Sequence, residues 1–149
     1  MRAFLGLIFL LLSSCGSHEM LEVQQFHLRE TDSGKVGEVD AMVRGEMNKR
    51  LYGAVTAAAR ENRLGQYYDV NWRQLSGELP VGVVFEYRQA ATGSQILRVE
   101  RNFDRAVTGA TSFEVTGENY QKNGRVTAWQ ITLLEGGAEK ASRRSYLWR

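Results

Sequence analysis

The sequence predicts a mainly β fold: an antiparallel β-sandwich of about six to seven strands, preceded by a short helical segment. Three observations lead to this prediction. From Gly65 onward, apolar and polar residues alternate with a period of two, as in strands with one buried face. Turn segments rich in glycine separate these stretches. Between Val36 and Leu64 the apolar residues recur about every four residues instead, as in a helix.

The segment from Val36 to Leu64 predicts a broken helix. Its apolar stripe, with Met42 and Tyr52 beside it, consists of Val39, Val43, Met47, Leu51 and Val55. Gly45 and Gly53 interrupt the stripe, and each costs a helix about 1 kcal/mol relative to alanine. We expect the stripe to pack in the core. An alternative is a first strand over Leu51–Thr56.

Five strands are predicted between Gly65 and Leu134. Their inward residues are Tyr68, Val70 and Trp72; then Val81, Val83, Phe85 and Tyr87; Leu97, Val99 and Phe103; Phe113 and Val115; and Trp129, Ile131 and Leu133. Asn123-Gly124 suits a tight hairpin turn, and Gly136-Gly137 marks the turn into a last strand from Ala141 to Trp148. Deleting the last five residues is expected to unfold the domain, because losing a buried Leu147 or Trp148 costs about 3–5 kcal/mol.

The run from Tyr67 to Trp148 resembles immunoglobulin-like or fibronectin-type sandwich domains in strand number and rhythm. Tyr120 stands ahead of a strand, where such folds place a corner tyrosine. The alternative is an α+β fold, in which a helix over Val39–Arg63 packs across a curved antiparallel sheet.

The N-terminus has the anatomy of a secretory signal. Arg2 precedes an apolar run from Ala3 to Leu12, which is too short for a spanning helix of roughly 20 residues. The following Leu12-Ser13-Ser14-Cys15 resembles the lipobox of bacterial lipoproteins. The resemblance implies that residues 1–14 are removed as a signal peptide. Cys15, the only cysteine, then becomes the first mature residue and carries fatty acyl chains such as palmitate.

This reading divides the chain into a signal peptide (1–14), a lipidated tether (15–35) and one β-rich domain (36–149). Leu21–Leu28 within the tether also suits an edge strand. A fully extended tether holds the domain tens of ångströms from the bilayer, at about 3.3–3.6 Å per residue. The expected location is the bacterial cell envelope, facing the periplasm or the cell surface. Gly16 is not the aspartate that retains some lipoproteins at the inner membrane, which favours an outer membrane where one exists.

Charge argues against a nucleic-acid partner. The chain has 19 basic and 17 acidic residues, and nucleic-acid surfaces usually show clustered basic charge. The basic pairs Lys49-Arg50 and Arg143-Arg144 are expected to be solvated.

No catalytic, metal or cofactor motif stands out in the sequence. His18 and His27 are the only histidines, and both lie in the tether. A structural zinc site needs four N or S ligands, so none is expected. The candidate carboxylates for a hydrolase are Glu86, Glu100, Asp104, Glu114 and Glu118. Their positions on polar strand faces favour cross-strand charge pairs with Arg88, Arg98 or Arg101 instead.

Aromatic residues offer a weak indication of a binding surface. Most of the set, comprising Trp72, Trp129, Trp148, Tyr68, Tyr87 and Tyr146, falls on predicted apolar faces. Tyr67 is the exception, since its phase puts it on the polar face with Asp69 and Arg73. An exposed Tyr67 would suit stacking against a sugar or a peptide.

The sequence therefore favours a membrane-anchored envelope lipoprotein with a non-catalytic, β-rich binding or structural domain. Its expected partners are the membrane, through Cys15, and an envelope protein or polysaccharide. No cofactor is expected. Two alternatives stay open: a hydrolase of envelope or surface polymers that uses two carboxylates, and an accessory subunit of an envelope complex.

Overall fold

The computed structural model describes residues 19–30 and 40–149. The strands in this part of the chain are β1 (Leu21–Leu28), β2 (Gly65–Trp72), β3 (Pro80–Gln89), β4 (Leu97–Arg105), β5 (Gly109–Thr116), β6 (Val126–Glu135) and β7 (Ala138–Arg144). The α-helices are α1 (Ala41–Leu51), α2 (Ala57–Glu61) and α3 (Gly117–Asn123), and a 3₁₀ turn, η2, covers Ala90–Thr92. The prediction of a mainly β protein is confirmed.

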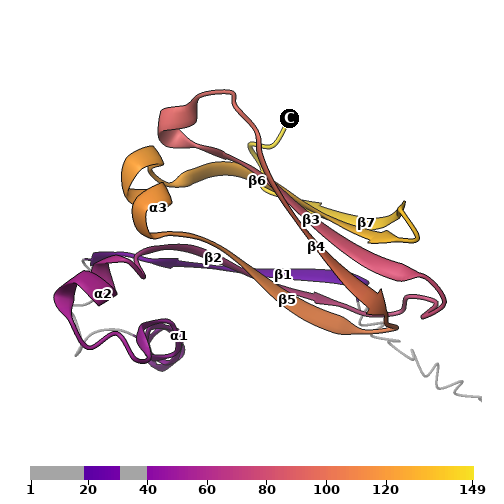
Figure 1. Ribbon diagram of the computed structural model, residues 1–149, viewed down its shortest axis with the longest axis horizontal. Coiled ribbons are helices and arrows are strands. Elements are labelled where there is room, and N and C mark those ends of the chain that lie inside the picture. Colours follow the sequence, from indigo (N-terminus) through magenta and orange to yellow (C-terminus); the bar gives the residue numbers. More distant parts are fainter. Residues whose placement is uncertain (1–18, 31–39) are drawn as a thin grey trace, which may run out of the picture.

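The strands form two antiparallel sheets. Sheet A has the order β1-β2-β5, and sheet B has the order β4-β3-β6-β7. The two sheets lie one above the other, and α1 and α2 cover the side of sheet A that faces away from sheet B (Figure 1). The helix packed on a sheet, which belonged to the α+β alternative, is therefore present, but it is combined with two sheets rather than one.

The main core lies between the sheets and follows the alternation in the sequence. Tyr68 and Val70 of β2 belong to the same buried cluster as Val83 and Phe85 of β3 and Ile131 of β6. The rings of Tyr68 and Phe85 lie 4.7 Å apart, one from each sheet. The period-two pattern was sufficient to predict these core residues, because each sheet buries one face against the other sheet and leaves its second face to solvent or helices.

The position of β1 corrects the prediction that residues 15–35 form a tether. Leu21–Leu28 pairs along its whole length with β2, from Leu21 opposite Trp72 to Leu28 opposite Gly65. Leu21 is buried in the main core, and Leu28 is buried under α1. The edge-strand interpretation of this stretch is therefore correct, and the interpretation of it as tether is wrong. Burial on both faces of β1 explains why its alternation is imperfect.

The broken helix is confirmed, but its apolar stripe is not a core stripe. Gly53, with φ 81°, lies in the link between α1 and α2. Met47 is buried and Leu51 is half-buried, whereas Val43 is 39% exposed and Val55 is 85% exposed. Val39 lies outside the described residues. Met47 and Leu51 join the cluster between α1 and sheet A, and Val55 lies beyond the end of the helix, so the four-residue repeat overstates the buried face of α1.

The C-terminal end also differs from the prediction. β7 ends at Arg144, and Tyr146 and Leu147 are 89% and 60% exposed, so the expected strand to Trp148 is wrong. The Gly136-Gly137 hairpin between β6 and β7 is present. Asn123-Gly124, by contrast, ends α3 rather than forming a hairpin, because β5 and β6 belong to different sheets.

Candidate functional site

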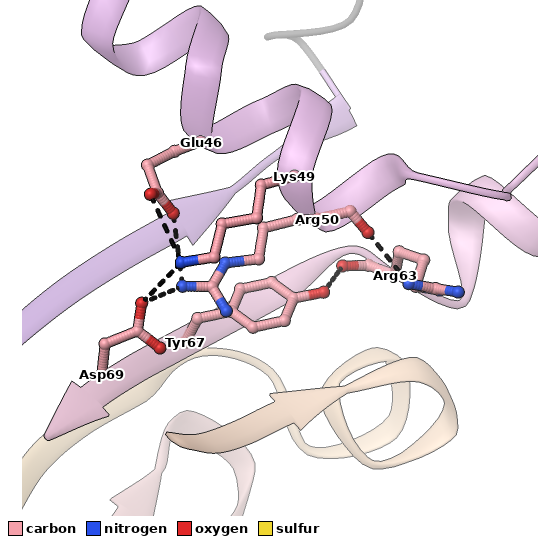
Figure 2. Close-up of polar contacts among 6 residues, drawn as sticks. All are labelled: Glu46, Lys49, Arg50, Arg63, Tyr67 and Asp69. Atoms are coloured by element: carbon pink, nitrogen blue, oxygen red, sulfur yellow. Dashed lines mark hydrogen bonds and ion pairs between the residues drawn. The ribbon is translucent and has the colours of Figure 1, made fainter. Parts of the chain in front are cut away.

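α1 crosses the outer face of sheet A on a small apolar cluster. Met47 packs there with Leu28 and Tyr67, and Phe26, Leu51 and Leu64 lie at its margin. Asp40 caps the helix by accepting a hydrogen bond from the Met42 N–H at 2.8 Å. This packing fixes the side of α1 that carries Glu46, Lys49 and Arg50 against β2 (Figure 2).

Tyr67 is on the outer face, as its phase predicts, but it is only 3% exposed because α1 covers it. The stacking role, which would require an exposed ring, is therefore not available to Tyr67. The Arg50 guanidinium lies over the Tyr67 ring, 4.5 Å from its centroid. The Tyr67 hydroxyl donates to the Arg63 carbonyl at 2.6 Å. Burial is the main cause that raises the pKa of Tyr67, followed by Glu114, while Arg50 and Arg63 oppose the rise.

Arg50 and Asp69 are the centre of an ion-pair network. The Arg50 guanidinium contacts the Asp69 carboxylate and lies 3.3 Å from Glu46. Lys49 donates to Asp69 at 3.3 Å (Figure 2). The side chain of Arg50 is 10% exposed, so the expectation of a solvated pair holds for Lys49 and fails for Arg50. The i, i+4 spacing of Glu46 and Arg50 was the available sequence signal.

Hydrogen bonds decide the charge state of Asp69. Its burial alone would raise the pKa, but hydrogen bonds from Ser112 and Arg50, with the positive charge of Arg50 and a hydrogen bond from Lys49, hold the pKa below its ordinary value of 3.8. Asp69 is therefore an ionised acceptor at neutral pH.

A groove of about 520 Å³ opens beside this network. Its lining comes from α1 and all three strands of sheet A: Gln24, Lys49, Arg50, Asp69, Asn71, Ala110, Thr111 and Ser112. Amide, hydroxyl, carboxylate and ammonium groups line it side by side. Such a surface offers many hydrogen-bond donors and acceptors to a polar partner. We call it the sheet A groove.

A second hollow, of about 450 Å³, lies at α2. It is lined by Glu30, Val55, Ala57, Arg60, Glu61 and Leu64. Arg60 donates from its Nε to the Ala54 carbonyl at 3.2 Å, which ties α2 to the preceding link. Of the six lining residues, Val55, Ala57 and Leu64 are apolar, whereas Ala110 is the one apolar residue among the eight that line the sheet A groove.

The five candidate carboxylates occupy exposed or half-exposed strand and helix positions. Glu86 and Glu100 both contact the Arg98 guanidinium, at 3.7 and 3.1 Å, on the outer face of sheet B. The contact between Glu86 on β3 and Arg98 on β4 is the predicted kind of cross-strand charge pair, whereas Glu100 and Arg98 lie on the same strand. Asp104, Glu114 and Glu118 are exposed, and none of the five lines the sheet A groove.

A further carboxylate, Glu135, is buried and was not singled out from the sequence. It accepts hydrogen bonds from the Ser76 hydroxyl and N–H, at 2.7 and 2.8 Å, and pairs with Lys140 at 3.4 Å. The bond from Ser76 is the largest cause that lowers the pKa of Glu135. These contacts hold the β2–β3 loop on the end of β6, which is a structural role.

The histidine and tryptophan side chains have structural partners. His27 lies on β1, and its Nε2 is 2.6 Å from the Tyr120 hydroxyl on α3. Trp129 donates to Gln25 at 3.2 Å, and Trp148 lies against the Arg88 guanidinium at 5.1 Å. Cys15 and His18 are outside the described residues. Among residues 19–30 and 40–149, no cluster of three or more His, Cys, Asp or Glu is arranged to hold a metal ion.

Comparison with known proteins adds no relative. No family model, curated protein or solved structure matches this chain. None of the helices in the described ranges is long and apolar enough to cross a membrane. The functional argument therefore depends on the residues themselves.

Proposed function

We propose that this chain is a lipid-anchored protein of the bacterial cell envelope whose β-rich domain binds a polar partner through the sheet A groove. The anchor is Cys15 in the lipobox-like Leu12-Ser13-Ser14-Cys15. The observation that carries the binding role is the groove, where uncharged donors and acceptors from three strands lie beside a fixed ion-pair network.

The network supports recognition rather than catalysis. Arg50 and Asp69 neutralise each other, and Tyr67 is buried beneath Arg50, so the walls of the groove are held in place before a partner binds. Preformed walls reduce the entropy lost on binding. Gln24, Asn71 and Thr111 supply amide and hydroxyl groups, which suit an envelope polysaccharide or a polar protein segment.

We also propose that the fold is an immunoglobulin-like or fibronectin-type sandwich. In support, the first, second and fifth strands share one sheet, and the third, sixth and seventh share the other, as strands A, B, E and C, F, G do in immunoglobulin domains. The fourth strand joins the second sheet. Two features depart from the type: helices α1 and α2 separate the first two strands, and the Tyr120 hydroxyl contacts His27 rather than backbone.

The hydrolase alternative has less support. It requires two of the five candidate carboxylates to face each other across a cleft, and Glu86 and Glu100 instead contact one guanidinium on an open sheet face. The accessory-subunit alternative would use another surface, either an exposed apolar patch or an unpaired edge strand such as β7 at the edge of sheet B.

The groove is tested with Ala110→Arg, which fills it from an exposed position without removing any member of the network. Ser142→Arg, on the exposed face of sheet B, is the matched control. Cross-linking in the native envelope should recover a partner with the wild type and with Ser142→Arg, but not with Ala110→Arg. Equal recovery by all three, or no partner for a stable wild type, contradicts the proposal.

A further inference from the structure

The helical layer on the outer side of sheet A exposes apolar side chains to solvent. Met42 on α1 is 83% exposed, and Tyr52 and Val55 in the α1–α2 link are each 85% exposed. α1 and α2 form the outermost layer of the molecule on this side (Figure 1). Grouped apolar exposure of this kind marks an interaction surface.

The same layer carries the excess positive charge of the chain. Asp40–Arg63 contains five basic and three acidic residues, which accounts for the whole net charge of +2. Arg44, Arg60 and Arg63 are exposed, whereas Lys49 and Arg50 belong to the ion-pair network with Asp69. Basic residues interleaved with exposed apolar ones complement the surface of an anionic bilayer.

The length of chain between Cys15 and the fold keeps the domain close to any membrane that holds Cys15. Glu19 and Met20 are held by the fold, because Glu19 pairs with Arg143 of β7 and the Met20 carbonyl accepts from the Arg73 N–H at 3.0 Å. Only three residues, Gly16 to His18, therefore separate Cys15 from the fold. At about 3.5 Å per residue, the chain from Cys15 to Glu19 spans no more than about 14 Å. This replaces the longer tether expected from the sequence. A helix is about 10–12 Å across, so this length is comparable to the thickness of the helical layer on sheet A.

We propose that the outer face of α1 and the α1–α2 link lies on the bilayer that anchors Cys15, with Met42, Tyr52 and Val55 among the headgroups. Arg44, Arg60 and Arg63 then contact anionic phospholipid. The inference rests on the proposed lipid anchor. It fixes the orientation of the domain, with sheet A towards the membrane and sheet B away from it, so that the sheet A groove opens near the bilayer surface.

The test places one fluorescent thiol label at a time on the full-length lipoprotein. Cys15 is the only cysteine, so acylation leaves an introduced cysteine as the only free thiol. Met42→Cys, Tyr52→Cys and Val55→Cys probe the face, and Ser142→Cys on sheet B is the control. The proteins are reconstituted in vesicles of phosphatidylethanolamine and phosphatidylglycerol. We expect a blue shift and several-fold quenching by nitroxide lipid at the three probe positions and neither at Ser142→Cys.

The outcomes separate the inference from the function on which it rests. If the protein floats with vesicles but all four labels respond alike, the membrane orientation is overturned and the anchor stands. If labels at the three positions change only with a purified envelope protein and not with vesicles, the face binds protein and the inference is again overturned. If the wild type itself takes the label at Cys15 and does not float, the proposed anchor fails, and the orientation fails with it.

Discussion

Arg50 shows how one side chain can connect a helix to a sheet. Its guanidinium contacts Asp69 and Glu46 and covers the Tyr67 ring, so it joins α1 to β2 by charge and by packing. A nearly buried cation is stable only while its partners remain, since an unpaired buried charge is costly. The adjacent Lys49 reaches the same carboxylate from solvent and is much less constrained.

Replacing Arg50 should therefore cost far more than replacing Lys49. Arg50→Met leaves Asp69 partly buried with a weaker partner and is expected to lower the free energy of unfolding by about 2–3 kcal/mol. Lys49→Met, with a side chain 57% exposed, should cost at most about 0.5 kcal/mol. Urea unfolding of both variants measures the difference. Equal effects would mean that the network does not stabilise the helix on the sheet.

Asp69 predicts an acid-dependent part of the stability. Its pKa is lower in the folded protein than its ordinary value of 3.8, so it binds protons less readily when folded. The stabilisation is fully present above that ordinary value and is lost as the pH falls through the lower folded pKa. The stability difference between wild type and Asp69→Asn should stay constant from pH 7 to about pH 5 and shrink below about pH 4. A difference independent of pH down to acid unfolding would contradict this assignment.

The same substitution to alanine should have opposite effects on stability at Gly109 and at Gly45. A Cβ at Gly109 would overlap the indole ring of Trp72 in the core, so Gly109→Ala should destabilise the fold by about 1–3 kcal/mol. A Cβ at Gly45 in α1 meets nothing within 4 Å, so Gly45→Ala should stabilise by about 0.5–1 kcal/mol. Thermal unfolding of both variants checks the two signs, and a stabilising Gly109→Ala would show that the Trp72 contact is not tight.

At the scale of elements, the sequence correctly predicted the strands whose apolar and polar residues alternate. It missed the features that depend on contacts between elements. The strands β2, β3, β5 and β6 follow their period-two pattern, because each contributes alternate residues to the core between the sheets. β4 has no buried residue, and Val99, which was expected to face inward, is 41% exposed. β1 was assigned mostly to the tether because it is buried on both faces, and Tyr67 was expected in solvent because a single sequence does not show which face a helix covers. The ion pair of Arg50 and Asp69 was missed for the same reason, since it joins two elements.

The end of the chain gives a prediction that reverses the one from the sequence. Because β7 ends at Arg144, deleting Tyr146–Arg149 removes the exposed Tyr146 and Leu147, the contact of Trp148 with Arg88, and the hydrogen bond from Arg88 to the Arg149 carbonyl at 3.2 Å. We expect a folded protein that loses about 1 kcal/mol. The deletion keeps Ser145, whose hydroxyl accepts from the Trp129 N–H at 3.0 Å. Removal of the whole of Ala138–Arg149 is the comparison that should unfold the domain, as judged by near-ultraviolet circular dichroism.

At the scale of the whole molecule, the order of the layers is related to the position of the proposed lipid anchor. The helices α1 and α2, sheet A and sheet B lie in that order, and β1, the first strand in the described residues, is an edge strand of sheet A. In the proposed orientation, the groove and the exposed apolar residues of α1 face the bilayer that anchors Cys15. In the proposed function, the anchor determines what the groove can reach, which makes the modification of Cys15 the central claim.

The most direct test of that claim is the intact mass of the mature protein from its native envelope, measured beside Cys15→Ser. Our account predicts a wild-type chain that begins at Cys15, carries the mass of added acyl chains and partitions with membranes, while Cys15→Ser has no acyl mass and does not partition. A wild-type chain cut elsewhere, without acyl mass and released in the same way as the variant, would contradict it.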